Sequence, residues 1–408
     1  MSQTTIRPVK AIIIIVIALV LAFCSAMAAM GGVLRDGNPH MALRLPFTNG
    51  LAHGAMADLE LRADLVKTGG VLPEKLDPDL VTAARNGFRA EPTSFRAIRM
   101  LAFNLDSTGD SEAARSVMHK LIKITKRDDM VNFWLVQDSA KKEDLDSILK
   151  YYDYSLRSSR AVKELLISTM SNALADEGFV DPFTKMLGSE PPWADDFWRV
   201  AAARQENALN AATLRSRLHK QKIDNPANND VLILENLIKD GHFEEAFDLY
   251  AVLAGTTKAD GNSHVQGGDF VKRPRLYPVE WRLFSSGEFG SEVDLDTDSL
   301  LVSSLPNIQA TFATQIVHLP AGAYSLSAEA AIQTPAASSP LYLRLRCADA
   351  ESPRRPDDIL RVENGSSRTT IEVAEGGCSY YWLTLLGDEL DSLDGYDFAV
   401  SEIALARN

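Results

Sequence analysis

An uncharged apolar run near the N-terminus limits most strongly what this chain can fold into. Residues 11–34 contain no charged side chain, and Arg7 and Lys10 come just before them. As a helix, these 24 residues span roughly 36 Å, enough to cross a hydrocarbon core of about 30 Å. Positive charges tend to stay on the cytoplasmic side of a membrane. The sequence therefore predicts a cytoplasmic tip and transmembrane anchor at 1–34, with the remainder of the chain exported.

A cleaved signal peptide is the alternative interpretation of the same segment. Residues 11–23 have the length of a signal-peptide core, and residues 26–28 (Ala-Met-Ala) have the small-x-small form that a signal peptidase recognises. We favour the retained anchor because the apolar run continues past that site. A lipid anchor at Cys24 is not expected, since Phe23 stands where the attachment motif needs a small residue. Both main interpretations export everything that follows.

Composition narrows the remaining classes of protein. The 408 residues predict two or three domains, and a hydrophobic content of 46 % excludes both a disordered chain and a multi-span membrane protein. A net charge of −13 argues against nucleic acid, because that binding relies on lysine and arginine.

Cys347 and Cys378 fall on separate predicted strands. In an oxidising compartment we expect them to form a disulfide that contributes roughly 3 kcal/mol, with two buried thiols as the alternative.

Residues 35–254 are predicted to form stacked helical hairpins, because a spacing near 34 residues recurs along them. Small residues allow two antiparallel helices to approach closely, and larger ones fill the groove to the next hairpin. No hairpin can bury its apolar face alone, so hairpins stack. The packing positions that this spacing marks are Gly109, Ala114, Trp134, Tyr151, Gly241, Ala246 and Tyr250.

The hydrophobic period changes after the helical section. Residues 255–278 are rich in glycine and proline, which predicts a linker. From residue 279 onward apolar residues alternate with a period of 2, and turn signals such as residues 320–322 (Pro-Ala-Gly) and 364–365 (Asn-Gly) separate the runs. About seven strands in residues 279–408 predict a β-sandwich of jelly-roll type.

Three resemblances extend this interpretation. The helical section resembles tetratricopeptide-repeat proteins, although residues 162–225 lack the Gly/Ala pattern. Residues 315–324, Gln-Ile-Val-His-Leu-Pro-Ala-Gly-Ala-Tyr, resemble a turn of carbohydrate-binding-module-like sandwiches, which marks the fold and carries over no sugar-contacting residue. The order of anchor, repeats and β-domain is similar to exported envelope proteins of Gram-negative bacteria, some associated with polysaccharide production or export. The resemblance implies a single-pass inner-membrane protein with its bulk in the periplasm.

The sequence predicts no catalytic residue, no metal site and no cofactor. Its seven histidines are scattered with no pair at ligand spacing, and it has neither a nucleophile elbow nor a phosphate-binding glycine loop. Residues 294–299 open like a calcium loop, but Ser299 stands at the glycine position and Leu305 at the acidic one. We therefore expect a protein that is not an enzyme.

Aromatic residues give the one pattern that points to a ligand. Sugars stack on aromatic faces, and three consecutive rings in one strand must place at least one away from the core. Core packing is the alternative. The candidates are Trp281, Tyr342, Tyr380, Tyr381 and Trp382.

Two functions stay open: a non-catalytic membrane-anchored scaffold whose repeats bind envelope proteins, and a glycan-binding protein that uses the sandwich to bind polysaccharide. In both, residues 11–34 contact the membrane.

Overall fold

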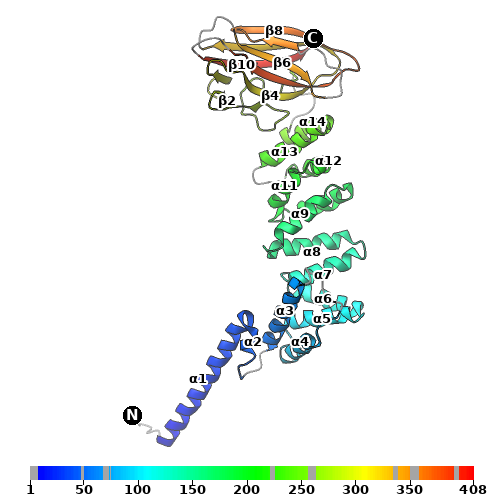
Figure 1. Cartoon of the computed structure of the whole chain (residues 1–408), viewed down its shortest axis with the longest axis vertical. Coiled ribbons are helices and arrows are strands. Elements are labelled where there is room, and N and C mark those ends of the chain that lie inside the picture. The colour runs from blue at the N-terminus through cyan, green and yellow to red at the C-terminus, as the bar shows by residue number, and fades with distance from the viewer. Residues whose placement is uncertain are drawn as a thin grey trace, which may run out of the picture. The chain divides into compact units, whose positions relative to one another are not determined.

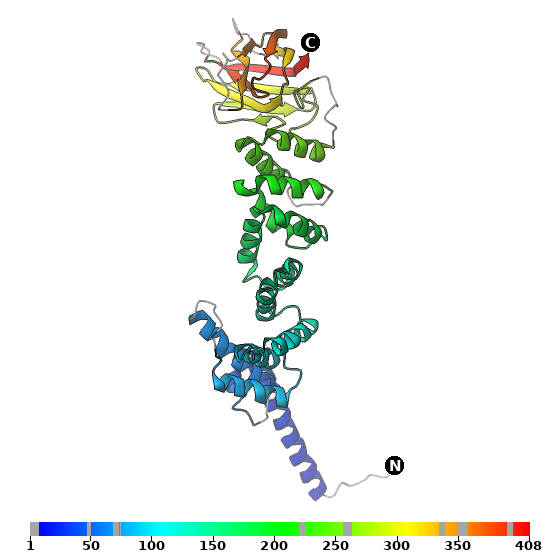
Figure 2. The same cartoon turned by 90° about the vertical axis from the view of Figure 1, so that its right-hand side faces the viewer.

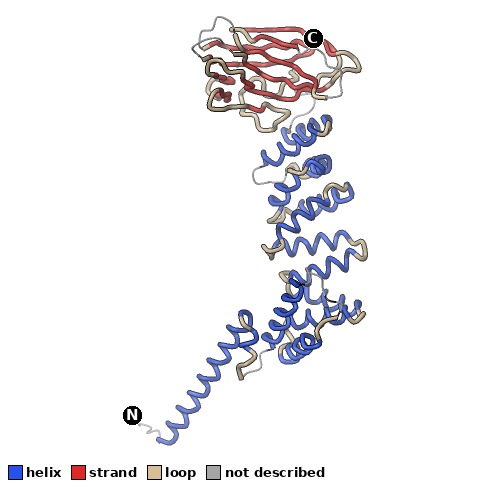
Figure 3. Tube along the Cα trace, viewed as in Figure 1, coloured by secondary structure: helices blue, strands red, loops and turns tan. Residues whose placement is uncertain are grey.

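The chain consists of helices followed by strands. The computed structural model describes residues 8–46, 50–67, 73, 75–220, 226–255, 263–333, 339–349, 358–389 and 395–408. Within them every helix precedes every strand (Figures 1 and 3). The predicted order of an apolar N-terminal helix, further helices and a C-terminal β-sandwich is therefore confirmed. Contacts divide the chain into two compact units, residues 1–163 and 164–408, and each is described by itself.

The first unit begins with the apolar helix α1 (Pro8–Gly37). Its stretch Ile12–Gly37 is long and apolar enough to cross a membrane, and its most apolar part is not buried. The helix runs without a break through residues 26–28, the peptidase site of the alternative interpretation. Its C-terminal end packs against α2 (Pro39–Ala42) and α3 (Gly50–Lys67), so the apolar segment continues directly into the folded part of this unit.

Aspartates at helix starts define the hairpins of the first unit. The further helices are α4 (Pro78–Ala90), α5 (Phe95–Ser107), α6 (Ser111–Ile124), α7 (Asp129–Ala140) and α8 (Leu145–Ser158). Consecutive helices pack as pairs, α5 on α6 and α7 on α8. The side chains of Asp77, Asp110, Asp128 and Asp144 each accept a hydrogen bond from a backbone N–H in the first turn of α4, α6, α7 and α8. This N-cap arrangement stabilises a helix start, so local sequence determines where these helices begin.

One buried arginine links three helices of this unit. Arg99 of α5 is 1 % exposed and pairs with Asp58 of α3 and with Asp128, the N-cap of α7. Asp128 also accepts a hydrogen bond from the Val131 N–H at 3.1 Å. A buried charge is stable only when it is paired. Helices α3, α5 and α7 are therefore held together by charge as well as by apolar packing.

The positions marked by the 34-residue spacing lie in helix cores and turns. Gly109 and Gly241 have φ values of 93° and 79° in the turns before α6 and α14 (Phe243–Ala254), a left-handed conformation that favours glycine. The other marked positions are all buried, both the small ones and the large ones: Ala114, Trp134, Tyr151, Ala246 and Tyr250. The tetratricopeptide assignment itself stays a prediction.

Acid is expected to weaken the first unit through Asp138 of α7. Arg115 donates two hydrogen bonds to this carboxylate, at 2.7 and 2.8 Å, and Lys142 donates one at 2.9 Å. Arg115 first, and then Lys142, lower the pKa of Asp138 from 3.8 to about 2. A carboxyl whose pKa is lower in the folded state stabilises that state fully above about pH 4, and the stabilisation is lost as pH falls toward about 2.

We therefore expect Asp138→Asn to be less stable than the natural protein at neutral pH, by about 2 kcal/mol. The two proteins should converge in stability near pH 2. Urea unfolding at a series of pH values, followed in peptides of α6–α8 by hydrogen exchange, measures this difference. A constant gap between the two proteins across the acid range would contradict the assignment.

In its described residues, the second unit opens with six α-helices and two short 3-10 helices, Glu177–Phe179 and Gln205–Asn207. The α-helices are α9 (Lys163–Ala173), α10 (Val180–Leu187), α11 (Ala194–Ala202), α12 (Ala208–Arg217), α13 (Pro226–Lys239) and α14. Aromatic rings contribute to the core of these helices. The ring centres of Phe183 and Phe197 are 5.3 Å apart, and those of Phe197 and Trp198 are 5.8 Å apart. Buried alanines pack in the same helices, among them Ala201 and Ala211.

Two five-stranded antiparallel sheets form the sandwich. Sheet A has the order β1-β4-β9-β6-β7 and sheet B the order β2-β3-β10-β5-β8. Their inner faces enclose one apolar core, in which Phe312, Leu326, Leu385 and Leu405 are fully buried. The strands are β1 (Arg282–Leu283), β2 (Phe289–Asp294), β3 (Ser299–Ser304), β4 (Ala310–His318), β5 (Gly322–Ile332), β6 (Leu341–Cys347), β7 (Asp358–Arg361), β8 (Gly365–Val373), β9 (Tyr380–Gly387) and β10 (Tyr396–Arg407).

The segment expected to be a linker is, in its described part, packed onto the sandwich. Residues 256–262 lie outside the described residues. Val265 and Phe270 belong to the sandwich core, and the Ile403 N–H donates to the Gly268 carbonyl at 2.8 Å. A side chain at Gly268 would place its Cβ 2.0 Å from the Ile403 carbonyl oxygen, so glycine is needed there for close approach. At Gly268, therefore, glycine serves close packing against β10.

Candidate functional site

Alternation along β6 and β9 sends one set of side chains to the core and the other to the outer face of sheet A. Leu343 and Leu345 of β6 and Leu383 and Leu385 of β9 belong to the core. Residues that alternate with them point to the opposite face. We call this set the β6–β9 face: Tyr342, Arg344 and Arg346 from β6, and Trp382, Thr384 and Leu386 from β9.

Strand register pairs the six residues across the two strands. Arg346 is opposite Trp382, Arg344 is opposite Thr384, and Tyr342 is opposite Leu386. Opposite side chains in an antiparallel pair have Cβ atoms about 4.5–5.5 Å apart. From the first pair to the last the face extends over roughly 14 Å. Aromatic rings, guanidinium groups and a hydroxyl therefore form two parallel rows.

Hydrogen bonds and stacking order one end of this face. The Arg344 guanidinium lies 5.5 Å from the centre of the Tyr342 ring, and its Nη2 donates to the Tyr342 hydroxyl at 3.4 Å. On the neighbouring strand β7, Arg361 lies 3.6 Å from the carboxylate of Asp388. Burial raises the pKa of Tyr342 above its usual range, so its hydroxyl stays protonated. The ring and the hydroxyl of Tyr342 thus both contact the Arg344 guanidinium.

Most of the predicted aromatic residues do not form a common platform. Trp281 is 2 % exposed and lies in the sandwich core, and Tyr381 packs against that core. Tyr380 stacks on His318 of β4, with ring centres 4.6 Å apart. Trp382 is half-buried on the outer face, 6.5 Å from the Tyr277 ring. Of the five candidates, Tyr342 and Trp382 belong to the β6–β9 face, and Tyr342 is buried there, with 4 % of its surface exposed.

No protein-family model and no curated protein matches the chain. Solved structures do match. A chain described as CBM4 aligns at TM-score 0.27 and 13 % identity over 35 % of this chain and 99 % of that one. TmCBM61 in complex with β-1,4-galactotriose aligns at TM-score 0.25 and 13 % identity over 36 % of this chain and 100 % of that one. The enzymatically active domain of bacteriophage CBA120 tailspike protein 4 aligns at TM-score 0.27 and 14 % identity. That match covers 36 % of this chain and 22 % of the tailspike chain.

The last helical hairpin covers another part of the outer face of sheet A. Phe243 of α14 stacks on Tyr380 with ring centres 4.8 Å apart, and Phe247 lies 5.7 Å from the same ring. Arg282 of β1 lies 3.1 Å from Glu235 of α13. Both views show α14 next to the sandwich (Figures 1 and 2). The spacing of the two phenylalanines by four residues, on one face of a helix, was a signal for this contact.

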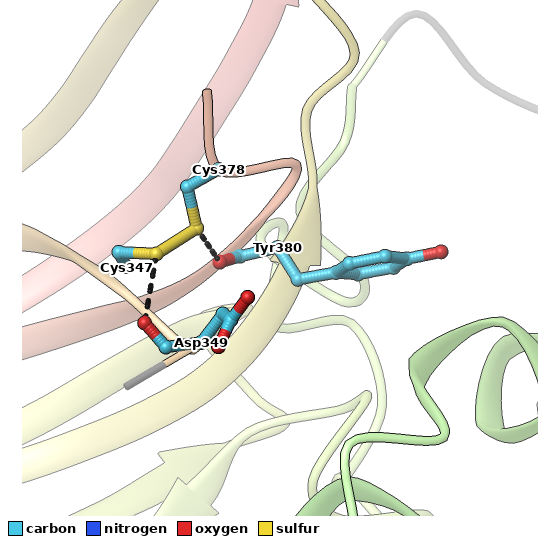
Figure 4. Close-up of a disulfide and its surroundings, with 4 residues drawn as sticks. All are labelled: Cys347, Asp349, Cys378 and Tyr380. Atoms are coloured by element: carbon cyan, nitrogen blue, oxygen red, sulfur yellow. Dashed lines mark hydrogen bonds between the residues drawn. A yellow bond between two sulfur atoms is a disulfide. The ribbon is translucent and has the colours of Figure 1, made fainter. Parts of the chain in front are cut away.

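The predicted disulfide between Cys347 and Cys378 is confirmed (Figure 4). Its two Cα atoms are 5.9 Å apart and its cysteines are 31 residues apart in sequence. It joins the last residue of β6 to the turn before β9. The Cys378 sulfur lies 2.8 Å from the Tyr380 carbonyl oxygen. The covalent bond therefore closes the end of the β6–β9 face at which Arg346 and Trp382 stand.

The calcium-like segment has a structural role in the β2–β3 turn. The carboxylate of Asp294 accepts a hydrogen bond from the Thr297 hydroxyl at 2.7 Å and one from the Asp296 N–H at 3.0 Å. The Thr297 hydroxyl and then the backbone N–H groups lower the pKa of Asp294. Across the described part of the chain, no three His, Cys, Asp or Glu side chains gather at a distance suited to a metal ion.

Sequence reasoning missed the polar half of the β6–β9 face. Arg344, Arg346 and Thr384 were not singled out, although residues 341–347 (Leu-Tyr-Leu-Arg-Leu-Arg-Cys) alternate regularly. That alternation places Tyr342 and both arginines on one side of a strand. Their pairing with Trp382 depends on the register between β6 and β9, which a single strand does not encode.

Proposed function

We propose that this protein is a membrane-anchored glycan-binding protein whose ligand lies along the β6–β9 face. The observation that carries the proposal is the pairing of half-buried Trp382 with exposed Arg346, beside Thr384 on the same strand. A sugar ring presents C–H groups on its faces and hydroxyls at its edge. The indole ring of Trp382 can stack on the C–H groups of a sugar face. The guanidinium and hydroxyl groups beside it can form hydrogen bonds with the sugar hydroxyls.

The N-terminal half of the chain serves as anchor and support in this proposal. An unbroken α1 continues nine residues beyond Ala28 to Gly37 and packs on α2 and α3. The apolar length of this helix supports a membrane anchor, and the proposal places the remainder of the chain in the periplasm because Arg7 and Lys10 precede the apolar run. The hairpins then connect membrane and sandwich, and envelope proteins that dock on them remain a further prediction.

Binding without turnover is part of the proposal. The β6–β9 face contributes arginine, tyrosine, threonine, leucine and tryptophan side chains, and the nearby carboxylate of Asp388 is engaged by Arg361 at 3.6 Å. Glycoside hydrolysis requires two carboxyl groups placed across the scissile bond. The residues of this face are suited to hold a sugar chain rather than to cleave it.

Trp382→Ala is expected to weaken glycan binding about three- to tenfold, because a stacked ring contributes about 0.5–1.5 kcal/mol beyond burial. The full-length protein in detergent micelles is run through gels that contain dissolved polysaccharide, and its retardation measures affinity. Trp382→Phe should retain most of the binding because it retains a ring.

Phe133→Ala provides the matched control, since Phe133 is an aromatic residue of α7 that is 52 % exposed. It should leave retardation unchanged. Thermal melts accompany each variant, because Trp382 is half-buried and its truncation removes some packing. Equal retardation of Trp382→Ala and the natural protein, with both folded, would contradict the proposed face.

A further inference from the structure

The chain after α1 enters a stretch whose composition differs from the rest. Residues 37–57 contain no acidic side chain, and Arg44 is the one lysine or arginine among them, although the whole chain has a net charge of −13. We call residues 38–45, which comprise α2 and the turn after it, the exit turn. Met41 is 52 % exposed and Arg44 is exposed, while Leu45 is half-buried. The exit turn therefore presents apolar side chains and one positive charge at the end of α1.

The length of the apolar run sets the depth of this turn in a bilayer. A helix crosses a hydrocarbon core of about 30 Å in about 20 residues, so a crossing centred on residues 11–34 ends near Gly32. Gly31 is nevertheless buried, and contacts join the end of α1 to α2 and α3 (Figure 1). The folded part of the first unit therefore reaches α1 at the edge of the hydrocarbon core, where the lipid headgroups lie.

Polar contacts hold the exit turn against the folded helices. The carboxylate of Asp36, just before the end of α1, accepts a hydrogen bond from Arg96 of α5 at 2.5 Å. His40 of the exit turn lies 3.7 Å from the carboxylate of Glu60 in α3, and Ala42 is fully buried. The exposed side chains of the exit turn therefore keep a fixed place relative to α1.

We propose that the exit turn lies in the headgroup layer of the membrane that α1 crosses, with Met41 at the boundary of the acyl chains and Arg44 at the level of the lipid phosphates. This rests on the membrane anchor of the proposed function and adds a second contact with the same bilayer. An apolar side chain is stabilised at that boundary, and the long arginine stem allows its guanidinium to stay in the polar layer. The acid-free stretch suits an anionic lipid surface, which attracts basic groups and repels acidic ones.

The test measures the depth of single fluorescent labels in vesicles of phosphatidylcholine and phosphatidylglycerol. The full-length protein carries Cys24→Ala, because Cys24 is a free cysteine whereas Cys347 and Cys378 are bonded to each other. An environment-sensitive label is attached at Met41→Cys, and lipids with a nitroxide on the upper acyl chain serve as quencher. We expect the emission to fall by about half, because an interfacial side chain lies about 5–10 Å into the boundary between headgroups and acyl chains.

Three further variants make the result specific. A label at Val20→Cys, inside the apolar run and 55 % exposed, should be quenched by nitroxides deep in the acyl chains. Phe133→Cys is the matched control, since Phe133 is as exposed as Met41 but lies on α7, which packs on α6 and α8; its label should stay unquenched. Arg44→Glu should reduce the quenching at Met41 by about twofold, because lipid phosphates repel a carboxylate. Melting temperatures should match that of the Cys24→Ala protein.

The outcomes separate this contact from the anchor on which it rests. Quenching at Val20 without quenching at Met41 would overturn the headgroup contact and leave the anchor in place. No quenching at Val20 would overturn the anchor and the contact together, whereas the Trp382 assay tests glycan binding independently. Equal quenching at Met41 and Phe133 would show unspecific adsorption and would overturn the contact. A blue-shifted but unquenched label at Met41 would place a protein surface over the exit turn in place of lipid. Unchanged quenching in Arg44→Glu would remove Arg44 from the contact.

Discussion

Replacing Arg99 by methionine is expected to destabilise the first unit by about 3–5 kcal/mol, because it removes one partner from a buried ion pair. Arg99 is 1 % exposed and lies between Asp58 and Asp128. Asp58 keeps contacts with Arg62 at 3.1 Å and Arg96 at 3.7 Å. Asp128 would be left with its backbone donor in α7, so the charge stranded there accounts for most of the expected loss.

Hydrogen exchange in urea, read in peptides of α3, α5 and α7, measures this effect within the full-length chain. Arg62→Met is the matched control, since Arg62 contacts the same Asp58 but its side chain is 55 % exposed, and exposed pairs contribute about 0.2–1 kcal/mol. The double variant Arg99→Met with Asp128→Asn should regain part of the loss, because asparagine keeps the N-cap without the charge. A loss in Arg99→Met no larger than in Arg62→Met would show that the pair is not decisive.

Removing the disulfide is expected to cost the second unit about 3 kcal/mol of stability, because the bond closes a loop in the unfolded chain. The Cys347→Ala, Cys378→Ala double variant tests this. Phe243 of α14 stacks on Tyr380, two residues after Cys378, so α14 should lose exchange protection together with β9. Helices of residues 1–163 should keep theirs, since they belong to the other compact unit.

Chemical reduction of the natural protein should reproduce the loss seen in the double variant, which excludes an effect of the alanine substitutions. Glycan retardation should also fall, because the bond closes the Arg346–Trp382 end of the β6–β9 face. Full retention of α14 protection while β9 becomes unprotected would contradict the packing of this helix on the sandwich.

Patterns local in sequence predicted the elements of this fold well. The uncharged run at 11–34 predicted a long apolar helix, and α1 spans Pro8–Gly37. Alternation predicted the strands, because period 2 is a property of each strand alone. The disulfide was predicted from two cysteines on separate predicted strands of a chain expected to be exported. Each of these signals lies within a short segment or depends on compartment chemistry.

Contacts between distant segments were not predictable in the same way. Tyr380 and Trp382 lie on the same side of β9, and both point away from the core. The sequence therefore gave no sign that α14 would cover Tyr380 while Trp382 stayed half-buried. Residues 255–278 were predicted to be a linker, because glycine serves both flexible turns and close backbone approach. At Gly268 the second use applies, 2.0 Å being left between a Cβ and the Ile403 carbonyl oxygen. Whether a glycine serves a flexible turn or a close approach is decided by the strand that packs against it, and the sequence of its own segment does not show this.

The stacking of α14 on β9 has a mechanical consequence for anything held at Trp382. Tyr380 and Trp382 are next-but-one neighbours on the same strand, and β9 is hydrogen-bonded on both sides, to β4 and β6. Under the proposed function, a pull on a bound polymer would enter β9 at Trp382 and would be shared with the two flanking strands. It would reach α14 through the Tyr380 and Phe243 rings, so the load would be spread over many weak contacts.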